Sequence, residues 1–344
     1  MNRDGLGLSN ETIQQLGSSY SVNPDRILAL NQSIVDQYSA ETGISRAPLV
    51  DRLKLWLSSH YEFRRNTLTD LISMRRLSSS QWLQVNTATL WVEMNSDNRS
   101  IGKGKKGGDI TISKSDIENI IDSDFVPEFD PILNYFESLP AWDEKTDHIR
   151  SLASHIVVDD QEFWLEQFSM ALVRSIACWR GDLVNRIIMT LIGELEETGK
   201  SSFIRFLCPP QLKEYYKEDP MVHDKDGYLA LCENFIWNLE ELDELDRKEV
   251  SSMKAIISQE VVKQRRSYAR YPSRMRRIVN FWASTNKNDI LSDIKNTRWL
   301  CFNVLSVNHD YNNLLTGVKN VDIDKVWAQA WHLYKAGSRF VLTS

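Results

Sequence analysis

A glycine–lysine–serine triplet that follows a strand-like apolar run is the feature that most constrains this fold. The run extends from Ile187 to Ile192, and Gly199, Lys200 and Ser201 then open a short helical pattern that continues from Phe203. A strand, a loop and a helix in this order direct backbone N–H groups and a lysine at bound phosphate. The sequence therefore predicts an α/β layer that binds a phosphorylated ligand at this loop.

The residue types in this loop suit a nucleoside triphosphate with its metal ion. Backbone N–H groups would surround the β-phosphate, the Lys200 ammonium would reach the β- and γ-phosphate oxygens, and the Ser201 hydroxyl would bind Mg²⁺. We therefore expect ATP and Mg²⁺ as cofactors. The expected nucleotide-binding residues are Gly193, Thr198, Gly199, Lys200, Ser201 and Ser202.

The same loop departs from the usual spacing and is acidic. Five residues separate Gly193 from Gly199, and Glu194, Glu196 and Glu197 are among them. Four residues are usual at this position. Carboxylates oppose triphosphate binding unless they point outward or meet cations, so the sequence leaves open whether ATP is hydrolysed.

A second strand-like run, Phe235 to Leu239, leads directly into Glu240 and Glu241. Paired carboxylates in that position can bind the metal ion through one acid and polarise the attacking water with the other. We expect Glu240 to be the metal ligand and Glu241 the catalytic base, with Asp243 and Glu244 as competitors for these roles. The alternative is that the acidic stretch is only a solvated helix.

Two further segments supply candidate residues for sensing and assisting hydrolysis. The strand-like run from Ile278 to Ser284 is followed by Thr285 and Asn286, and Arg298 precedes another run that starts at Trp299. Asn286 can lie between the γ-phosphate and the attacking water, and an arginine in the position of Arg298 can reach the γ-phosphate of a neighbouring subunit. The alternatives are a simple turn and a surface arginine.

A basic segment is the candidate nucleic-acid interface. The whole chain has a formal net charge of −6, yet residues 261–287 contain no acidic residue. Arginine, lysine and interleaved tyrosine side chains can contact phosphates and stack on bases. The alternative is an ordinary solvated loop. The expected contact residues are Lys263, Arg265, Arg266, Tyr268, Arg270 and Arg274.

The rest of the chain predicts a domain order. Residues 1–110 are expected to be a mainly helical region of unknown role, with helical spacing from Leu8 to about Leu90 and a Gly/Lys-rich linker at its end. A helical segment would span 111–182, and an ATPase core 183–344. The start of the chain lacks the apolar stretch of a signal peptide, so we expect a cytoplasmic protein with no membrane contact. Cys178, Cys208, Cys232 and Cys301 are isolated, which predicts free thiols.

These segments together resemble the virulence-associated E family, ATPases of phages and mobile elements related to superfamily III helicases of the AAA+ class. The resemblance runs from about Pro131 to Tyr334. It rests on the order of short motifs: Trp142-Asp143, Gly199-Lys200-Ser201, Glu241-Leu242-Asp243-Glu244-Leu245, Arg266-Ser267-Tyr268-Ala269-Arg270, Thr285-Asn286, Asn296-Thr297-Arg298-Trp299 and Trp327-Ala328-Gln329-Ala330.

The resemblance implies an α/β fold with an AAA+-like P-loop ATPase core, a homo-oligomer such as a hexameric ring, and a role in replicating mobile-element DNA. Our hypothesis is an ATP-dependent helicase or translocase that grips DNA, single-stranded or at a fork, through the basic segment. Two alternatives remain open: a nucleotide-binding scaffold that assembles on DNA without unwinding it, and a degenerate DNA-binding protein that does not hydrolyse ATP.

Overall fold

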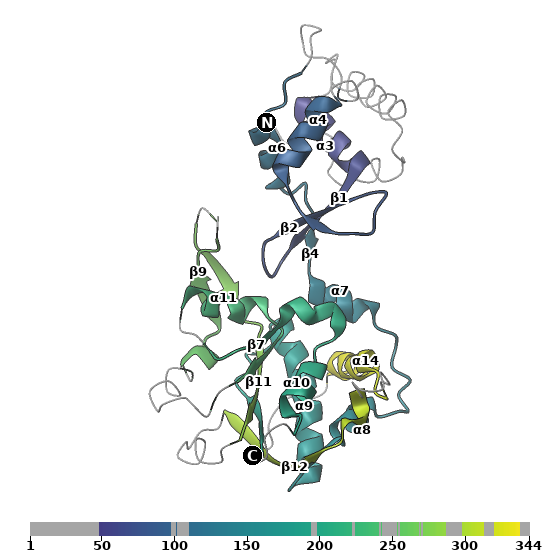
Figure 1. The fold of residues 1–344 in the computed structure, drawn as a ribbon, viewed down its shortest axis with the longest axis vertical. Helices are drawn as coiled ribbons and strands as arrows, with labels where there is room; N and C mark the ends of the chain where they lie inside the picture. Colours follow the sequence, from purple (N-terminus) through teal and green to yellow (C-terminus); the bar gives the residue numbers. More distant parts are fainter. Residues whose placement is uncertain are drawn as a thin grey trace. The chain divides into compact units, whose positions relative to one another are not determined.

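The chain folds into two compact units, Met1–Asp130 and Pro131–Ser344 (Figure 1). A computed structural model describes residues 48–97, 101, 110–193, 198–221, 224–240, 242, 253, 255–267, 269, 271–286, 298–312 and 320–337. No helix within these ranges is long and apolar enough to cross a bilayer.

The described part of the first unit combines three helices with a four-stranded sheet of order β3-β2-β1-β4. Strands β1 and β2 form an antiparallel hairpin, and the short strand β4 runs parallel to β1. In chain order the elements are α3 (Leu49–His60), β1 (Tyr61–Asn66), β2 (Ile72–Arg76), β3 (Leu83–Gln84), α4 (Thr87–Ser96), α6 (Lys114–Ile121) and β4 (Glu128–Phe129).

The helices of this unit cover one face of the sheet. Phe63 of β1 and Met74 of β2 lie opposite each other in register and point into a core with apolar side chains of all three helices. Side chains alternate across a strand, so Arg64 and Arg75 belong to the other face. Helix α6 begins with a reciprocal cap in which Ser113 and Asp116 each bond the other's backbone N–H.

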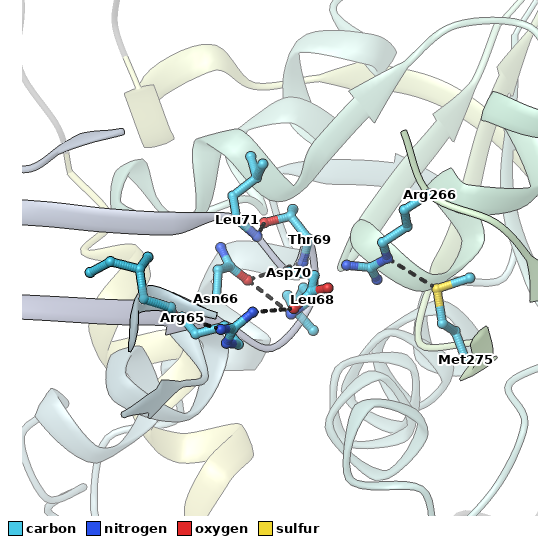
Figure 2. A network of polar contacts seen from close by, with 9 residues as sticks. Arg65, Asn66, Leu68, Thr69, Asp70, Leu71, Arg266 and Met275 are labelled. Carbon is cyan, nitrogen blue, oxygen red and sulfur yellow. Dashed lines mark hydrogen bonds and ion pairs between the residues drawn. The ribbon is translucent and has the colours of Figure 1, made fainter. Parts of the chain in front are cut away.

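The expectation of helical structure from Leu8 to Leu90 is wrong between residues 61 and 84, where the chain forms β1, β2 and β3. The turn between β1 and β2 explains part of the difference (Figure 2). Asn66 Oδ1 accepts hydrogen bonds from the N–H groups of Leu68 (2.8 Å) and Thr69 (3.2 Å), and Asp70 takes a left-handed conformation with φ 61°. An Asx turn of this kind reverses the chain, so that β2 can pair with β1 in a hairpin.

The second unit is built on a six-stranded sheet of order β5-β12-β6-β11-β8-β7. All neighbouring pairs are parallel except the pair of β5 with β12. Its strands are β5 (Ile156–Val158), β6 (Ile188–Ile192), β7 (Tyr216–Glu218), β8 (Ile236–Leu239), β11 (Asn280–Thr285) and β12 (Trp299–Val307). The four strands expected from the apolar runs are thereby confirmed.

The strand order identifies the fold class. Numbered along the chain, the parallel strands β6, β7, β8, β11 and β12 are first to fifth, and in the sheet they lie in the order fifth, first, fourth, third, second. The strand before the phosphate loop is therefore central, with the strand that precedes Asn286 beside it. This parallel-rich α/β sheet confirms the expected fold class and is consistent with a P-loop ATPase core.

Helices flank the sheet, and a separate hairpin interrupts the chain between β8 and β11. Helix α9 buries Trp164 and Phe168 against Phe203 and ends at Gly181, whose φ of 94° only glycine adopts readily. The remaining elements are α7 (Pro131–Ser138), α8 (His148–Ala153), α9 (Gln161–Arg180), α10 (Lys200–Phe206), a 3₁₀ turn (Pro210–Tyr215), α11 (Lys225–Glu233), β9 (Val261–Gln264), β10 (Ser273–Arg276), a 3₁₀ turn (His309–Asn312) and α14 (Ile323–Lys335).

The boundary between the two units lies between Asp130 and Pro131, within the segment 111–182 that the sequence analysis treats as one helical segment. Helix α6 belongs to the first unit, whereas α7, α8 and α9 belong to the second.

Candidate nucleotide-binding site

Three parallel strands end at the same edge of the sheet. In the register of the sheet, Thr285 of β11 lies beside Ile192 of β6, and Ala283 lies beside Leu239 of β8. The N–H of Gly193 donates to the carbonyl oxygen of Thr285 (3.1 Å), which joins the start of the phosphate loop to the end of β11. Ligands of open α/β sheets bind at this carboxyl edge.

The Lys200 ammonium gathers residues from three segments at that edge. Its Nζ donates to Gly193 O (3.1 Å), Thr198 Oγ1 (3.1 Å) and Asn286 Oδ1 (3.0 Å), and the residue is only 6% exposed. These three acceptors are neutral oxygens, which bind an ammonium less strongly than charged phosphate oxygens do. The arrangement brings together four of the residues that we expected to bind or sense the nucleotide.

The Ser201 hydroxyl also contacts the end of β11. Its Oγ lies 2.9 Å from the Oγ of Ser284, and either hydroxyl can be the donor. Ser202 is half-buried beside it on α10. The sequence analysis missed Ser284, although its place one residue before Thr285 on an expected strand was a usable signal.

Because Gly199 has no side chain, it leaves room for the imidazole of His309, a residue that the sequence analysis did not consider. Its φ is 88°, and a Cβ at this position would lie 2.2 Å from Cε1 of His309. Any other residue at 199 would therefore displace the histidine as well as strain the backbone. His309 is exposed and stands in the 3₁₀ turn just after β12, so only the strand order reveals its proximity to the loop.

Glu240 follows β8 directly and lies within electrostatic reach of Arg205 on α10. The Arg205 guanidinium bonds Glu218 of β7 (2.7 Å), and this hydrogen bond, more than the charge of Glu240, raises the pKa of Arg205. The Asn238 amide donates to the same Glu218 carboxylate (3.2 Å). Arg205 and Glu218 were not expected at this edge. Glu241, Glu244 and the three acids of the phosphate loop lie outside the described residues.

Arg298 is not part of this cluster. Its carbonyl accepts a hydrogen bond from the N–H of Ile188 (2.7 Å), at the start of β6. Lys200 follows the opposite end of that strand, and the strand between them is about 13 Å long at 3.3 Å per residue. Within one chain the structure thus places the arginine at the amino edge of the sheet and the lysine at the carboxyl edge.

The basic segment forms an antiparallel hairpin of β9 and β10. Lys263 and Arg274 lie directly opposite each other in its register, and both are exposed, as is Arg265. Arg266 is instead largely buried, with Nε donating to Met275 Sδ (3.3 Å; Figure 2) and Nη2 3.7 Å from Glu233. Tyr268 and Arg270 lie outside the described residues.

Two arginines at the end of the same basic segment have a structural role. Arg277 is completely buried and donates to the carbonyl oxygens of Ile257 (2.6 Å), Asn185 (2.6 Å) and Val279 (3.1 Å). Burial lowers its pKa to about 10, which keeps it charged at neutral pH. Arg276 donates to the carbonyl oxygen of Trp179 at the end of α9. These two side chains attach the base of the hairpin to the core.

Comparison with known proteins gives a family match and a number of similar structures, of which three are described. Residues 136–344 match the model of the virulence-associated protein E-like domain. No curated protein matches the chain. The apo structure of the NrS-1 C-terminal region (305–718) is 14% identical, with a TM-score of 0.47 over 85% of this chain and 75% of that one. Two A-form apo structures of the same region are each 12% identical. The first has a TM-score of 0.45 and covers 84% of this chain and 69% of its own. The second has a TM-score of 0.47 and covers 82% of this chain and 72% of its own.

Proposed function

Because the chain belongs to the virulence-associated protein E-like family, we propose that it is a Mg²⁺-dependent ATPase that drives DNA translocation or unwinding. The DNA is that of a phage or mobile element under replication. The observation that carries this proposal is the Lys200 ammonium, held beside Asn286 at the carboxyl edge of a sheet with the strand order of P-loop ATPases.

ATP would bind with its β- and γ-phosphates at Lys200, because charged phosphate oxygens bind an ammonium more strongly than the neutral oxygens of Gly193, Thr198 and Asn286 do. The residues available for a metal ion fit Mg²⁺, since Ser201 and Glu240 offer a hydroxyl and a carboxylate, the hard oxygen donors that this ion prefers. When bound, the ion would neutralise charge on the phosphate oxygens. The remaining ligands of Mg²⁺ would come from phosphate and water.

Hydrolysis would use three residues from different segments of the chain: Glu241, Asn286 and Arg298. Glu241 would orient the attacking water, and the Asn286 amide, already 3.0 Å from the lysine nitrogen, would contact the γ-phosphate. Arg298 would act on the nucleotide of a neighbouring subunit, because the sheet separates it from its own Lys200. An arginine supplied in this way stabilises the charge that spreads over the transferred phosphoryl group. This assignment requires a homo-oligomer, and a ring satisfies it.

The β9–β10 hairpin is the proposed DNA contact. Lys263 and Arg274 are like charges in directly opposed positions, which destabilises a strand pair unless an anion lies between them. A phosphate backbone supplies such anions along its length. The chain runs from β10 through the anchored Arg277 into β11, which ends beside Asn286. Movement of the hairpin would therefore be coupled to the strand that senses the nucleotide.

The test is ATP turnover, with and without single-stranded DNA, for the wild type and Lys200→Ala. We expect the substitution to lower turnover by about 100-fold or more, the usual loss when one donor to the reacting phosphates is removed. Lys213→Ala is the matched control, since Lys213 is exposed in the 3₁₀ turn after α10. Measurable turnover that is equal in wild type and Lys200→Ala would refute the proposed site.

A nucleotide-binding scaffold without hydrolysis is the second candidate, and the acidic phosphate loop favours it. In that case the wild type would bind ATP and DNA but show no turnover above the Lys200→Ala background. Titration with a fluorescent ATP analogue separates this outcome from a protein that no longer binds nucleotide at all.

A further inference from the structure

The face of the first unit's sheet that lies opposite the three described helices carries arginines and aromatic rings. Because Phe63 and Met74 point into the core, the alternation places Glu62, Arg64 and Arg75 on the other side. Phe129 joins them, since it pairs in register with Asn66. We call this surface the Trp82 face; its members are Glu62, Arg64, Arg75, Trp82 and Phe129.

The side chains of the Trp82 face are linked by cation–π contacts. The Arg64 guanidinium carbon lies 4.1 Å from the ring centroid of Trp82 and 4.3 Å from that of Phe129. The Arg75 guanidinium carbon lies 5.0 Å from the Trp82 centroid, and Arg75 pairs with Glu62 at 2.6 Å. Arg64 therefore contacts both rings and Arg75 contacts Trp82, and both rings are half-buried.

The cation–π contacts of the Trp82 face contribute little to the stability of the sheet. Its core is already formed on the helical side, whereas a cation–π pair at an exposed site contributes only about 0.5–1 kcal/mol. The local charge is also opposite to that of the chain: residues 60–84 hold four arginines and two acids, in a protein of net charge −6. A surface of this composition attracts a polyanion with planar groups.

We propose that the Trp82 face binds single-stranded nucleic acid. Bases would stack on the rings of Trp82 and Phe129, and the phosphates would contact Arg64 and Arg75. Single strands fit because their bases are free to stack, whereas the bases of a duplex are already stacked on each other. This interface is distinct from the β9–β10 hairpin, and it gives the first unit a function that does not depend on ATP.

The experiment uses the full chain with the double substitution Lys263→Gln/Arg274→Gln, so that binding at the hairpin is weakened. Binding is measured without ATP by fluorescence anisotropy, with a labelled 20-nucleotide oligo(dT) and with an abasic strand of the same length. On this background we compare Trp82→Leu with Trp91→Leu, a matched control on α4 whose side chain is 40% exposed.

We expect Trp82→Leu to weaken oligo(dT) binding between about 5-fold and 100-fold, the range for loss of one stacked base. Trp91→Leu should bind like its parent, and Trp82→Phe should restore most of the affinity because a ring remains. The abasic strand should bind weakly to all of these proteins. Circular dichroism and thermal melting check that each variant is folded; should Trp82→Leu unfold, Phe129→Leu replaces it with the same expectation.

Three outcomes would overturn the proposal. One is an unchanged affinity of Trp82→Leu for oligo(dT), and another is an equal loss with the abasic strand, which would indicate a site for phosphates alone. The third is a background protein that does not bind oligo(dT). None of these depends on ATP hydrolysis, so failure here is distinct from failure of the proposed ATPase.

Discussion

Desolvation sets the chemistry of the cysteine side chains in the second unit. Burial raises the pKa of Cys208 and Cys232 to about 12, and that of Cys301 to about 11. Only the thiolate reacts with alkylating agents, and an unperturbed thiol has a pKa near 8.5. In the folded protein these thiols should therefore be almost entirely protonated at pH 8.

Alkylation with iodoacetamide at pH 8 tests this expectation. Cys208 and Cys232 should react about 1,000-fold or more slowly in the folded protein than in urea, because the thiolate fraction falls by that factor. Cys301 reaches solvent although the surrounding protein partly desolvates its thiol, and it has the lowest of the three pKa values, so it is the internal control and should react first. Mass spectrometry of tryptic peptides gives the order, and rapid labelling of Cys208 without denaturant would contradict the assignment.

Residues of one type have different roles that only burial distinguishes. In the sequence, Lys263, Arg274 and Arg277 belong to one basic segment, and nothing there separates them. In the structure, Arg277 is enclosed by three carbonyl oxygens while the other two are exposed. The sequence could therefore predict a cationic surface but not which of the basic residues are exposed on it.

The candidate site was predictable to the extent that it follows from strand ends. Lys200 and Asn286 could be expected together because each follows an apolar run, and parallel strands end at one edge. His309, Arg205 and Glu218 could not, because their proximity depends on which strands are neighbours in the sheet. Sequence spacing carries no information on that order.

At the scale of elements, the β9–β10 hairpin presents a charge arrangement that makes a measurable prediction. Lys263→Gln and Arg274→Gln should each reduce the slope of log affinity against log salt for single-stranded DNA by about 0.7, and together by about 1.4. Neither should lower the melting temperature, because each removes repulsion between directly opposed like charges. Lys213→Gln is the control. An unchanged slope would exclude these two residues from the DNA interface.

The strands of the second unit were easier to predict than those of the first for a physical reason. Strands β6, β8 and β11 are covered on both sides and are almost entirely buried, which leaves uninterrupted apolar runs. Strands β1 and β2 are buried on one side only and carry arginines on the other, so their apolar residues are few and look like a helical face. The hairpin β9–β10 was missed because its charges conceal the alternation.

At the scale of the whole molecule, the separation of Lys200 from Arg298 predicts complementation between subunits. Arg298→Ala and Lys200→Ala should each be inactive alone, yet a mixture should regain activity at interfaces that join an intact lysine to an intact arginine. Random mixing in equal amounts makes about a quarter of the interfaces competent, if the assembly is a closed ring. ATP turnover against mixing ratio is the measurement, with light scattering to establish assembly. A mixture as inactive as its components would contradict action between subunits.

Strand β12 connects two distant events. It begins just after Arg298 and ends just before His309, whose ring lies against Gly199. At nine residues it is about 26 Å long, and its pairing with β6 makes it stiff along its axis. A nucleotide that displaced the histidine would shift one end of this strand, and at the other end stands Arg298, which we propose acts on the nucleotide of a neighbouring subunit. If the protomers form a ring, nucleotide binding in one protomer would thereby affect the nucleotide site of the next through the backbone of β12.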